Sequence, residues 1–152
     1  MDCAICGTGK GKKIRAAYRT NYAGQPVSLS SVERYRCDHC GEEYFDPKQS
    51  HLADTQIKNA VRQMQGLLPP EKIVAIREKL GLTQTQLEFL FDKGQKVVTR
   101  WESGRVVQPR EADVLLRLLD RKPEMLEVLA AIADNRARAQ RKYARNAELV
   151  TA

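Results

Sequence analysis

Two closely spaced pairs of cysteines constrain the fold of this chain more than any other feature of its sequence. Each pair has the form Cys-x-x-Cys-Gly, and together they contain every cysteine of the 152 residues, namely Cys3, Cys6, Cys37 and Cys40. With two residues between them, both thiolates of a pair can reach one ion from a single tight turn, and four thiolates match the tetrahedral coordination of Zn²⁺. We therefore predict one structural zinc ion per chain, with no open position for a substrate.

Other roles for these side chains stay open. A single Cys-x-x-Cys pair is a dithiol redox centre in thioredoxin-like proteins, but such a pair begins a helix within a βαβ unit, a setting that neither pair has here. His39 lies inside the second pair and His51 lies on a predicted helix, so either could replace a cysteine as a metal ligand. Four thiolates complete the coordination without a histidine, which favours the four-cysteine site.

The residues around the cysteines can bury only a small core, because the first 66 residues contain few large apolar side chains. Short β-branched or aromatic stretches at 14–18, 27–29 and 32–37 predict a small antiparallel sheet or hairpin that brings the two cysteine pairs together. A structural zinc ion contributes on the order of 10 kcal/mol to folding. Metal binding would therefore supply the stability that this small core lacks.

A proline-containing linker divides the chain. Asp46 and Pro47 form the N-cap and first position of a predicted amphipathic helix over about 47–65, and two consecutive prolines then place a linker at about 65–70. The basic segment at the C-terminus is expected to be either a fraying helix or a disordered arm. The sequence thus predicts three regions, namely a zinc-binding domain at 1–66, a helical domain at 67–133 and a basic tail at 134–152.

The pattern after the linker is helical throughout. A predicted helix from Pro70 stops at Gly81, Thr83 begins a second helix with a Thr-x-x-Gln capping box, and a third spans about 95–103 after a turn at Gly94. Two more helices, from Pro109 and from Pro123, are expected to bury one face each, carrying Val114, Leu115 and Leu118 in the first and Leu126, Leu129 and Ile132 in the second. The expected fold is mainly α, with a small β zinc-ribbon-like N-terminal domain and a helical C-terminal bundle.

The composition narrows the class of function. Twenty-six Lys and Arg against nineteen Asp and Glu give a net charge of +7, which favours a polyanionic partner. No apolar run approaches the ~18–20 residues of a membrane span, and the N-terminal residues lack the apolar core of a signal peptide. We therefore expect a protein of the reducing cytoplasm that makes no membrane contact. No Ser/His/Asp set, phosphate-binding loop or carboxylate pair indicates an enzyme.

Residues 77–104 carry the features of a DNA-binding helix-turn-helix. Two short helices with a glycine-containing turn between them would pack at a steep angle and project the second helix outward. On that helix Lys96 and Arg100 share an exposed face with Thr99 beside them, and lysine and arginine donate to guanine in the major groove. We predict base contacts from these three residues and phosphate contacts from Thr83, Gln84 and Gln95.

The stretch Leu-Gly-Leu-Thr-Gln, followed later by Arg-Trp-Glu-x-Gly, resembles the lambda-repressor-like (XRE) helix-turn-helix family. Single charged residues are ordinary on any surface helix, so a helical bundle with solvated charges is the alternative. The capping box, the glycine positions and the Trp-Glu-x-Gly ending together favour DNA binding. Glu102 and Arg105 are expected to form local salt bridges or helix-end contacts rather than base contacts.

A four-cysteine zinc domain followed by this helix-turn-helix resembles the MqsA (YgiT-type zinc finger) antitoxins of bacterial toxin–antitoxin pairs, over about residues 1–130. The resemblance implies a homodimer whose C-terminal domains bind a palindromic operator in double-stranded DNA and repress their own operon, in the bacterial cytoplasm and at the nucleoid when bound. It also implies that residues 1–66 neutralise a protein toxin, typically an mRNA-cleaving ribonuclease. The family pairs an asparagine with the arginine, whereas this chain pairs Lys96 with Arg100, so we expect a different operator sequence.

Two other functions stay open from the sequence. One is a stand-alone zinc-containing XRE-type transcriptional regulator without a toxin partner, which a neighbouring ribonuclease-like reading frame would argue against. The other is a thiol oxidoreductase tethered to DNA, which stoichiometric zinc with protected thiols would exclude.

Overall fold

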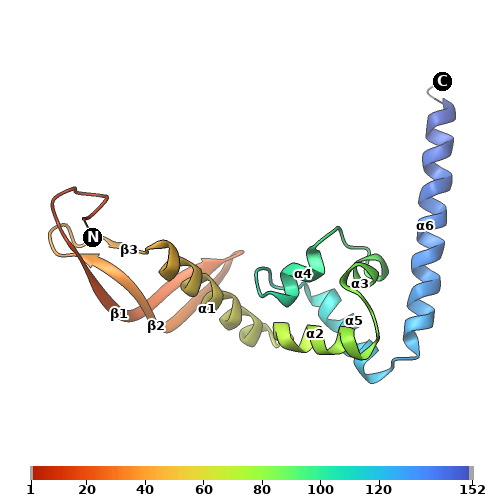
Figure 1. Cartoon of the computed structure of the whole chain (residues 1–152), viewed down its shortest axis with the longest axis horizontal. Coiled ribbons are helices and arrows are strands. Elements are labelled where there is room, and N and C mark those ends of the chain that lie inside the picture. The colour runs from red at the N-terminus through yellow and green to blue at the C-terminus, as the bar shows by residue number, and fades with distance from the viewer. Residues whose placement is uncertain (1, 151–152) are drawn as a thin grey trace. The chain divides into compact units, whose positions relative to one another are not determined.

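The computed structural model describes residues 2–150, apart from the side chains at 143 and 145–150 (Figure 1). It consists of two compact units, of which the first ends at Gly66 and the second begins at Leu67. Within the described residues, a three-stranded antiparallel sheet and one helix form the first unit, and five helices form the second. The predicted fold class, a small β zinc-ribbon-like domain followed by a mainly helical domain, is confirmed.

A long hairpin dominates the first unit. Strands β1 (Gly11–Tyr22) and β2 (Gln25–Cys37) are antiparallel and are joined by Ala23 and Gly24, whose φ angles of 48° and 83° suit a two-residue turn. The three short strands predicted from the sequence are parts of these two long ones, because cross-strand pairing keeps the residues between them extended. A third strand, β3 (Glu43–Tyr44), pairs with β2 and has no counterpart in the prediction, since two residues are too few to show a pattern.

A buried arginine forms hydrogen bonds with backbone carbonyl groups in the irregular part of this hairpin. The register between β1 and β2 shifts after Ala16, which forms a bulge. Arg34 is buried, and its guanidinium donates to the carbonyl oxygens of Ala16 at 3.1 Å and Ala17 at 3.2 Å. The same guanidinium pairs with Glu43 at the start of β3. Arg34 therefore binds two carbonyl groups at the bulge and joins β3 to this part of the hairpin.

Helix α1 (Pro47–Gln65) has the bounds that the sequence predicts. Asp46 and Gln49 form a capping box in which the Asp46 carboxylate accepts the Gln49 N–H at 2.7 Å. Gly66, with φ of 64°, ends the helix in the left-handed conformation. The helix packs on β2 and buries Ala53 and Val61, which gives the first unit its small apolar core.

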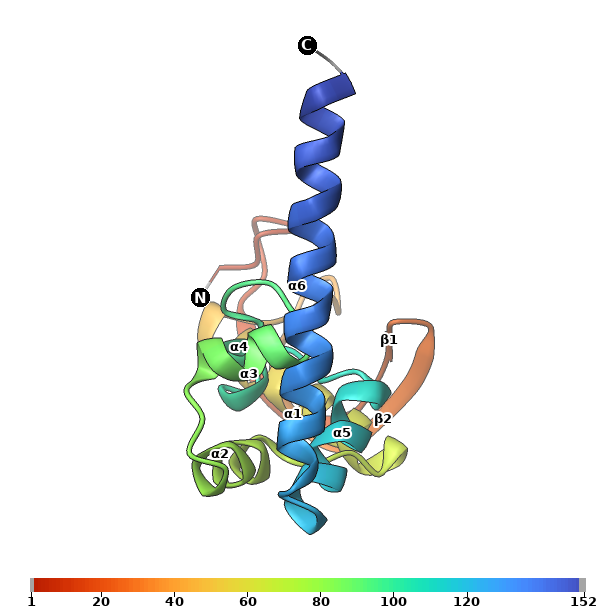
Figure 2. The same ribbon diagram turned by 90° about the vertical axis from the view of Figure 1, so that its right-hand side faces the viewer.

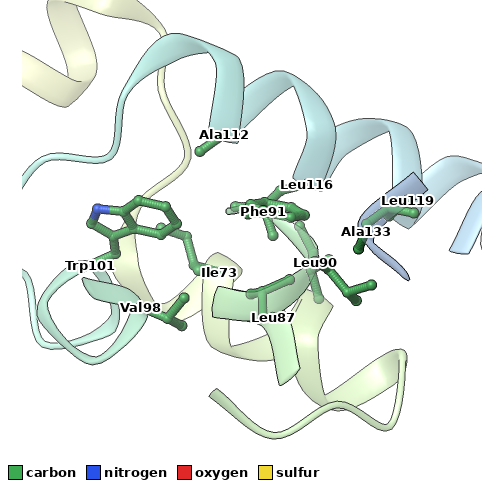
Figure 3. Close-up of a cluster of buried hydrophobic side chains, with 11 residues drawn as sticks. Ile73, Leu87, Leu90, Phe91, Val98, Trp101, Ala112, Leu116, Leu119 and Ala133 are labelled. Atoms are coloured by element: carbon green, nitrogen blue, oxygen red, sulfur yellow. The ribbon is translucent and has the colours of Figure 1, made fainter. Parts of the chain in front are cut away.

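Five helices form the second unit, namely α2 (Pro70–Lys79), α3 (Gln84–Leu90), α4 (Val97–Glu102), α5 (Arg110–Arg121) and α6 (Met125–Val150). Each contributes to one apolar core, in which Ile73, Leu87, Trp101, Leu116 and Ala133 are buried (Figure 3). Helix α4 has only six residues, too few to be stable alone. It is held instead by the burial of Val98 and Trp101.

The predicted apolar face of α5 is confirmed for Leu115, which packs against the core, and is wrong for Val114 and Leu118. Val114 and Leu118 are 54% and 42% exposed, and the buried face instead carries Ala112, Leu116 and Leu119. Apolar residues occur on both faces of this helix, so periodicity alone does not select one. The buried side of α5 also carries Asp113, whose carboxylate accepts the backbone N–H of Leu68 at 2.7 Å and so favours this orientation of the helix.

The predicted apolar face of α6 is confirmed for Leu126 and Leu129, which pack against the core, and is wrong for Ile132, which is 56% exposed. Ala130 and Ala133 lie against the core in its place. Helix α6 contacts α3 here, and an alanine lets two helices approach more closely than an isoleucine does. The close contact therefore selects the face that carries the small residues.

Helix α6 continues through Val150, so most of the predicted tail is helical, which is one of the two expected forms; residues 151–152 lie outside the described residues. Figure 2 shows the C-terminal part of α6 extending away from α2–α5. Arg136 holds the beginning of this extension, since its Nε lies 3.2 Å from the Asp92 carboxylate and its Nη2 donates to the Phe89 carbonyl. None of the described helices combines the length and apolar character that crossing a membrane requires.

Candidate metal centre and nucleic-acid interface

The four cysteines of the first unit meet in one cluster. Cys3 and Cys6 lie before β1, whereas Cys37 ends β2 and Cys40 lies in the following turn. The Sγ atoms of Cys3 and Cys40 are 3.8 Å apart, those of Cys6 and Cys37 are 3.7 Å apart, and all four lie within 4.8 Å of one another. Thiolates bound tetrahedrally at the usual Zn–S distance are about 3.8 Å apart. The cluster can therefore hold one metal ion, and its spacing suits zinc.

The two cysteine turns direct backbone N–H groups at sulfur. The N–H of Gly9 donates to Sγ of Cys6, and the N–H of His39 donates to Sγ of Cys37, both at 3.4 Å. The glycines that follow the pairs, at 7 and 41, have φ angles of 69° and 75°, which a glycine adopts without strain. Such N–H···S bonds orient metal-binding thiolates and stabilise their charge.

Without a cation, this cluster resists full ionisation. Hydrogen bonds from the hydroxyl and backbone of Thr8, and from the N–H of Gly9, lower the pKa of Cys6 to about 5. The backbone N–H of Glu42 favours the thiolate of Cys40, but desolvation and the neighbouring sulfur atoms outweigh it and raise the pKa of Cys40 to about 12. A divalent cation would remove this conflict, because its charge stabilises all four thiolates together.

Neither histidine joins the cluster. His39 and His51 are exposed, and the cysteines form the one group of potential ligand side chains close enough to share an ion in the part of the chain that the structure describes. Neither cysteine pair begins a helix of a βαβ unit, the setting expected of a dithiol redox centre. The geometry thus favours the four-cysteine metal site over both alternatives.

Gly9 is a further residue on which this site depends, although it lies outside both Cys-x-x-Cys-Gly motifs. A Cβ atom on Gly9 would lie 2.2 Å from Sγ of Cys37 and 2.8 Å from Cβ of His39. The substitution Gly9→Ala is therefore expected to push the two cysteine turns apart and lower zinc affinity about 10- to 100-fold, as measured by competition with a chromophoric chelator. Gly94→Ala is the control, because nothing lies within 4 Å of its added Cβ. Equal zinc affinity of Gly9→Ala and wild type would contradict the expectation.

In the second unit, α3 and α4 form a helix-turn-helix. The turn between them contains two residues in the left-handed conformation, Asp92 with φ of 54° and Lys96 with φ of 61°. Helix α4 therefore begins at Val97, and the prediction of a helix from 95 is wrong, because the backbone at Lys96 interrupts the helical geometry. Lys96 still adjoins the helix, since its carbonyl accepts the N–H of Arg100 at 3.2 Å.

A buried carboxylate fixes the position of α4 against α3. Glu88 of α3 is buried, and its Oε1 accepts the backbone N–H of Val98 at 3.1 Å, in the first turn of α4. This contact replaces the side-chain cap that Lys96 does not provide. The sequence pattern does not reveal this role of Glu88, because a glutamate within a helix is usually exposed.

The open side of α4 carries the residues predicted to contact bases. Lys96, Thr99 and Arg100 are exposed, whereas Val98 and Trp101 are buried in the core. Gln95, a predicted phosphate contact, is exposed in the turn that precedes the helix. The Lys96 ammonium just before the helix, together with the Thr99 hydroxyl and the Arg100 guanidinium on it, can make hydrogen bonds to base edges and to phosphates.

Two other predicted phosphate contacts already have partners within the chain. The hydroxyl of Thr83 accepts the N–H of Gln86 at 3.1 Å as the N-cap of α3. The Gln84 side chain donates to Glu102 at 2.7 Å and accepts the hydroxyl of Thr99 at 2.8 Å. These contacts assign both side chains a role in positioning α3 and α4.

Glu102 forms a local salt bridge, as expected. Its partner is Arg77 of α2, whose Nε lies 2.5 Å from Oε1 and whose Nη2 lies 3.2 Å from Oε2. The two side chains are only 6% and 13% exposed, so the pair joins α2 to the end of α4 away from water. The role of Arg77 cannot be read from the sequence, because its partner is 25 residues away. Arg105 is exposed just beyond α4.

Residues 1–130 match a family model described as the antitoxin component of a bacterial toxin–antitoxin system, MqsA. The chain belongs to the MqsA antitoxin family. It is 30% identical over 128 residues to Antitoxin MqsA of Escherichia coli (strain K12), a match that covers 83% of this chain and 97% of that relative. It is 32% identical over 65 residues to Antitoxin HigA-2 of Vibrio cholerae, covering 43% of this chain and 62% of that relative.

The MqsA match confirms the family resemblance seen in the sequence and extends over both units. The cysteine cluster and the helix-turn-helix lie inside the matched range, whereas residues 131–150 of α6 lie beyond it. Both relatives are named as antitoxins and neither is named as an enzyme.

Proposed function

We propose that this MqsA-family chain is an antitoxin that binds operator DNA through α4, represses its own operon and neutralises a partner toxin through residues 1–66. The observation that carries DNA binding is the open face of α4. Thr99 and Arg100 are exposed on this face and Lys96 is exposed in the turn immediately before it, while Trp101 is buried in the core. Within this proposal, residues 67–133 form the DNA-binding and dimerisation domain and residues 134–152 are a basic extension.

Zinc has a structural role in this proposal. One Zn²⁺ per chain would be bound by the thiolates of Cys3, Cys6, Cys37 and Cys40, whose clustered sulfur atoms support a tetrahedral site. Four protein ligands leave no position for a substrate, so the ion would stabilise the first unit rather than catalyse a reaction. A reducing bacterial cytoplasm, with the protein at the nucleoid when bound to DNA, would keep these thiols available.

A homodimer would present two copies of α4 to the same face of a duplex. Recognition helices about one turn of DNA apart, ~34 Å, favour a palindromic operator. Lys96 and Arg100 can each donate to guanine, and Thr83, Gln84 and Gln95 would lie toward the phosphates. A lysine cannot make the two-bond contact of an asparagine with adenine, so the operator would differ from one read by an asparagine.

The expected result for Arg100→Ala is a loss of about 1–3 kcal/mol in operator binding, with relaxed preference at one base position in each half-site. The physical reason is that Arg100 can donate two hydrogen bonds to one guanine. Titration of a labelled operator at fixed salt measures both effects. Arg121→Ala is a matched control, because it removes an exposed arginine from α5. Unchanged affinity and unchanged base preference in Arg100→Ala would show that α4 is not the recognition helix.

The toxin proposal can be tested with the full chain as bait. Zinc-loaded protein would be used to capture partners from its native cell, followed by mass spectrometry, with Cys37→Ser as the matched bait. Capture of one small ribonuclease-like protein at near-equal stoichiometry, lost in Cys37→Ser, would support the antitoxin role. A folded wild-type bait that captures no specific partner would favour a stand-alone zinc-containing regulator.

A further inference from the structure

A hydrogen-bond network of polar side chains links helices α2, α3 and α4 and ends on the open face of α4. It begins at Arg77, which donates to both oxygens of Glu102. Nε2 of Gln84 donates to Oε2 of Glu102 at 2.7 Å, and Oε1 of Gln84 accepts from Oγ1 of Thr99 at 2.8 Å. Thr99 is exposed, so the network ends at the surface with its side chain.

The chemistry of these four side chains fixes which group donates and which accepts in each hydrogen bond of the network. A carboxylate paired with a guanidinium only accepts, so Gln84 must turn its NH₂ group toward Glu102. The amide oxygen of Gln84 must then face Thr99, and this oxygen only accepts. The hydroxyl of Thr99 must therefore donate its one proton inward to Gln84. Toward solvent, Oγ1 of Thr99 offers lone pairs alone.

We propose that Gln84 is a positioning residue that turns Thr99 into a hydrogen-bond acceptor for DNA, so that Thr99 selects adenine or cytosine. In the major groove only adenine N6 and cytosine N4 donate, whereas guanine O6 and thymine O4 accept. This inference rests on the proposed function, in which α4 enters the major groove. Lys96 and Arg100 only donate, so Thr99 adds a requirement that neither cation can impose.

The test is selection of a randomised DNA duplex library by the full zinc-loaded chain, followed by affinity titrations. Wild type is expected to prefer adenine or cytosine at one position of each half-site by about 3- to 10-fold over guanine or thymine. Thr99→Val keeps the shape but lacks the hydroxyl, and it should lose this preference, whereas Thr99→Ser should keep it. Gln84→Met retains the length of the side chain but cannot orient the Thr99 hydroxyl. Duplexes that carry each of the four bases at this one position should then bind with affinities within about twofold of one another.

Several results would overturn the inference. A Thr99-dependent preference for guanine or thymine in wild type would show that the hydroxyl donates outward. Thymine preference that survives in Thr99→Val but not in Thr99→Ser would indicate a methyl contact. An unchanged preference in Gln84→Met, with its melting temperature close to that of wild type, would show that Gln84 does not orient Thr99.

Failure of the proposed function would look different. If no position responds to Thr99→Val while Arg100→Ala still relaxes another position, the helix-turn-helix binds as proposed and the role of Thr99 is wrong. If wild type selects no sequence at all, DNA recognition by α4 is itself wrong, and the inference about Thr99 is lost with it.

Discussion

Replacing Cys37 with serine is expected to abolish stoichiometric zinc binding and to unfold the first unit while α2–α6 stay folded. Sγ of Cys37 lies 3.7 Å from Sγ of Cys6, within the cluster that can hold the ion. A structural zinc ion contributes on the order of 10 kcal/mol to folding, more than a small apolar core can replace. Zinc content by elemental analysis and far-UV circular dichroism, with and without chelator, measure the two effects.

The matched control for Cys37→Ser is His39→Ala, which changes an exposed side chain inside the same turn. It should retain one zinc ion per chain, and loss of zinc from it would indicate a histidine ligand. A chelator should act on wild type as the serine substitution does, and added Zn²⁺ should restore the fold. Full zinc content in Cys37→Ser would contradict the four-cysteine site.

The second large effect is expected for Asp113→Ala, which should destabilise the second unit by about 2–4 kcal/mol. The carboxylate of Asp113 is buried and accepts three hydrogen bonds, from Leu68 N–H at 2.7 Å, Gln108 Nε2 at 3.1 Å and Arg117 Nε at 2.7 Å. Removing it leaves a backbone N–H and a buried amide without this acceptor. Urea unfolding followed by the fluorescence of Trp101, the chain's single tryptophan, reports on this unit alone.

Asp120→Ala is the control for Asp113→Ala, because it also removes a carboxylate from α5. The Asp120 carboxylate pairs with Lys79 at the surface rather than in the core. An exposed pair contributes about 1 kcal/mol or less, so this variant should stay close to wild type. Equal stability of Asp113→Ala and Asp120→Ala would show that the buried contacts do not stabilise the unit.

The contribution of Asp113 should also depend on pH. Burial opposes its charge, but the N–H of Leu68 and the side chains of Arg117 and Gln108 outweigh burial and lower its pKa below the usual value. A carboxyl group whose pKa is lower in the folded state stabilises the fold above the pKa of the unfolded chain, about 4. The stabilisation is lost as pH falls through the folded-state pKa. The stability difference between wild type and Asp113→Asn should therefore shrink below about pH 4.

The sequence predicted those features that depend on neighbouring residues. The bounds of α1, the capping box at Thr83 and the common site of the cysteines can each be read from a short stretch, because caps and metal-binding turns are local. The first residue of α4 could not be predicted in this way. Lys96 adopts a left-handed backbone, and the helix that follows it is held by the contact of Glu88 with Val98, which are distant in sequence.

The spacing of the four cysteines, the capping residues and the family pattern over residues 1–130 determined the fold class and the family from the sequence alone. Only the tertiary structure decided which face of α5 is buried, why Gly9 must lack a side chain and in which direction the Thr99 hydroxyl donates. These outcomes depend on groups that are distant in sequence and meet only after folding. Burial there removes water, so each polar group must bind the partner that the fold provides.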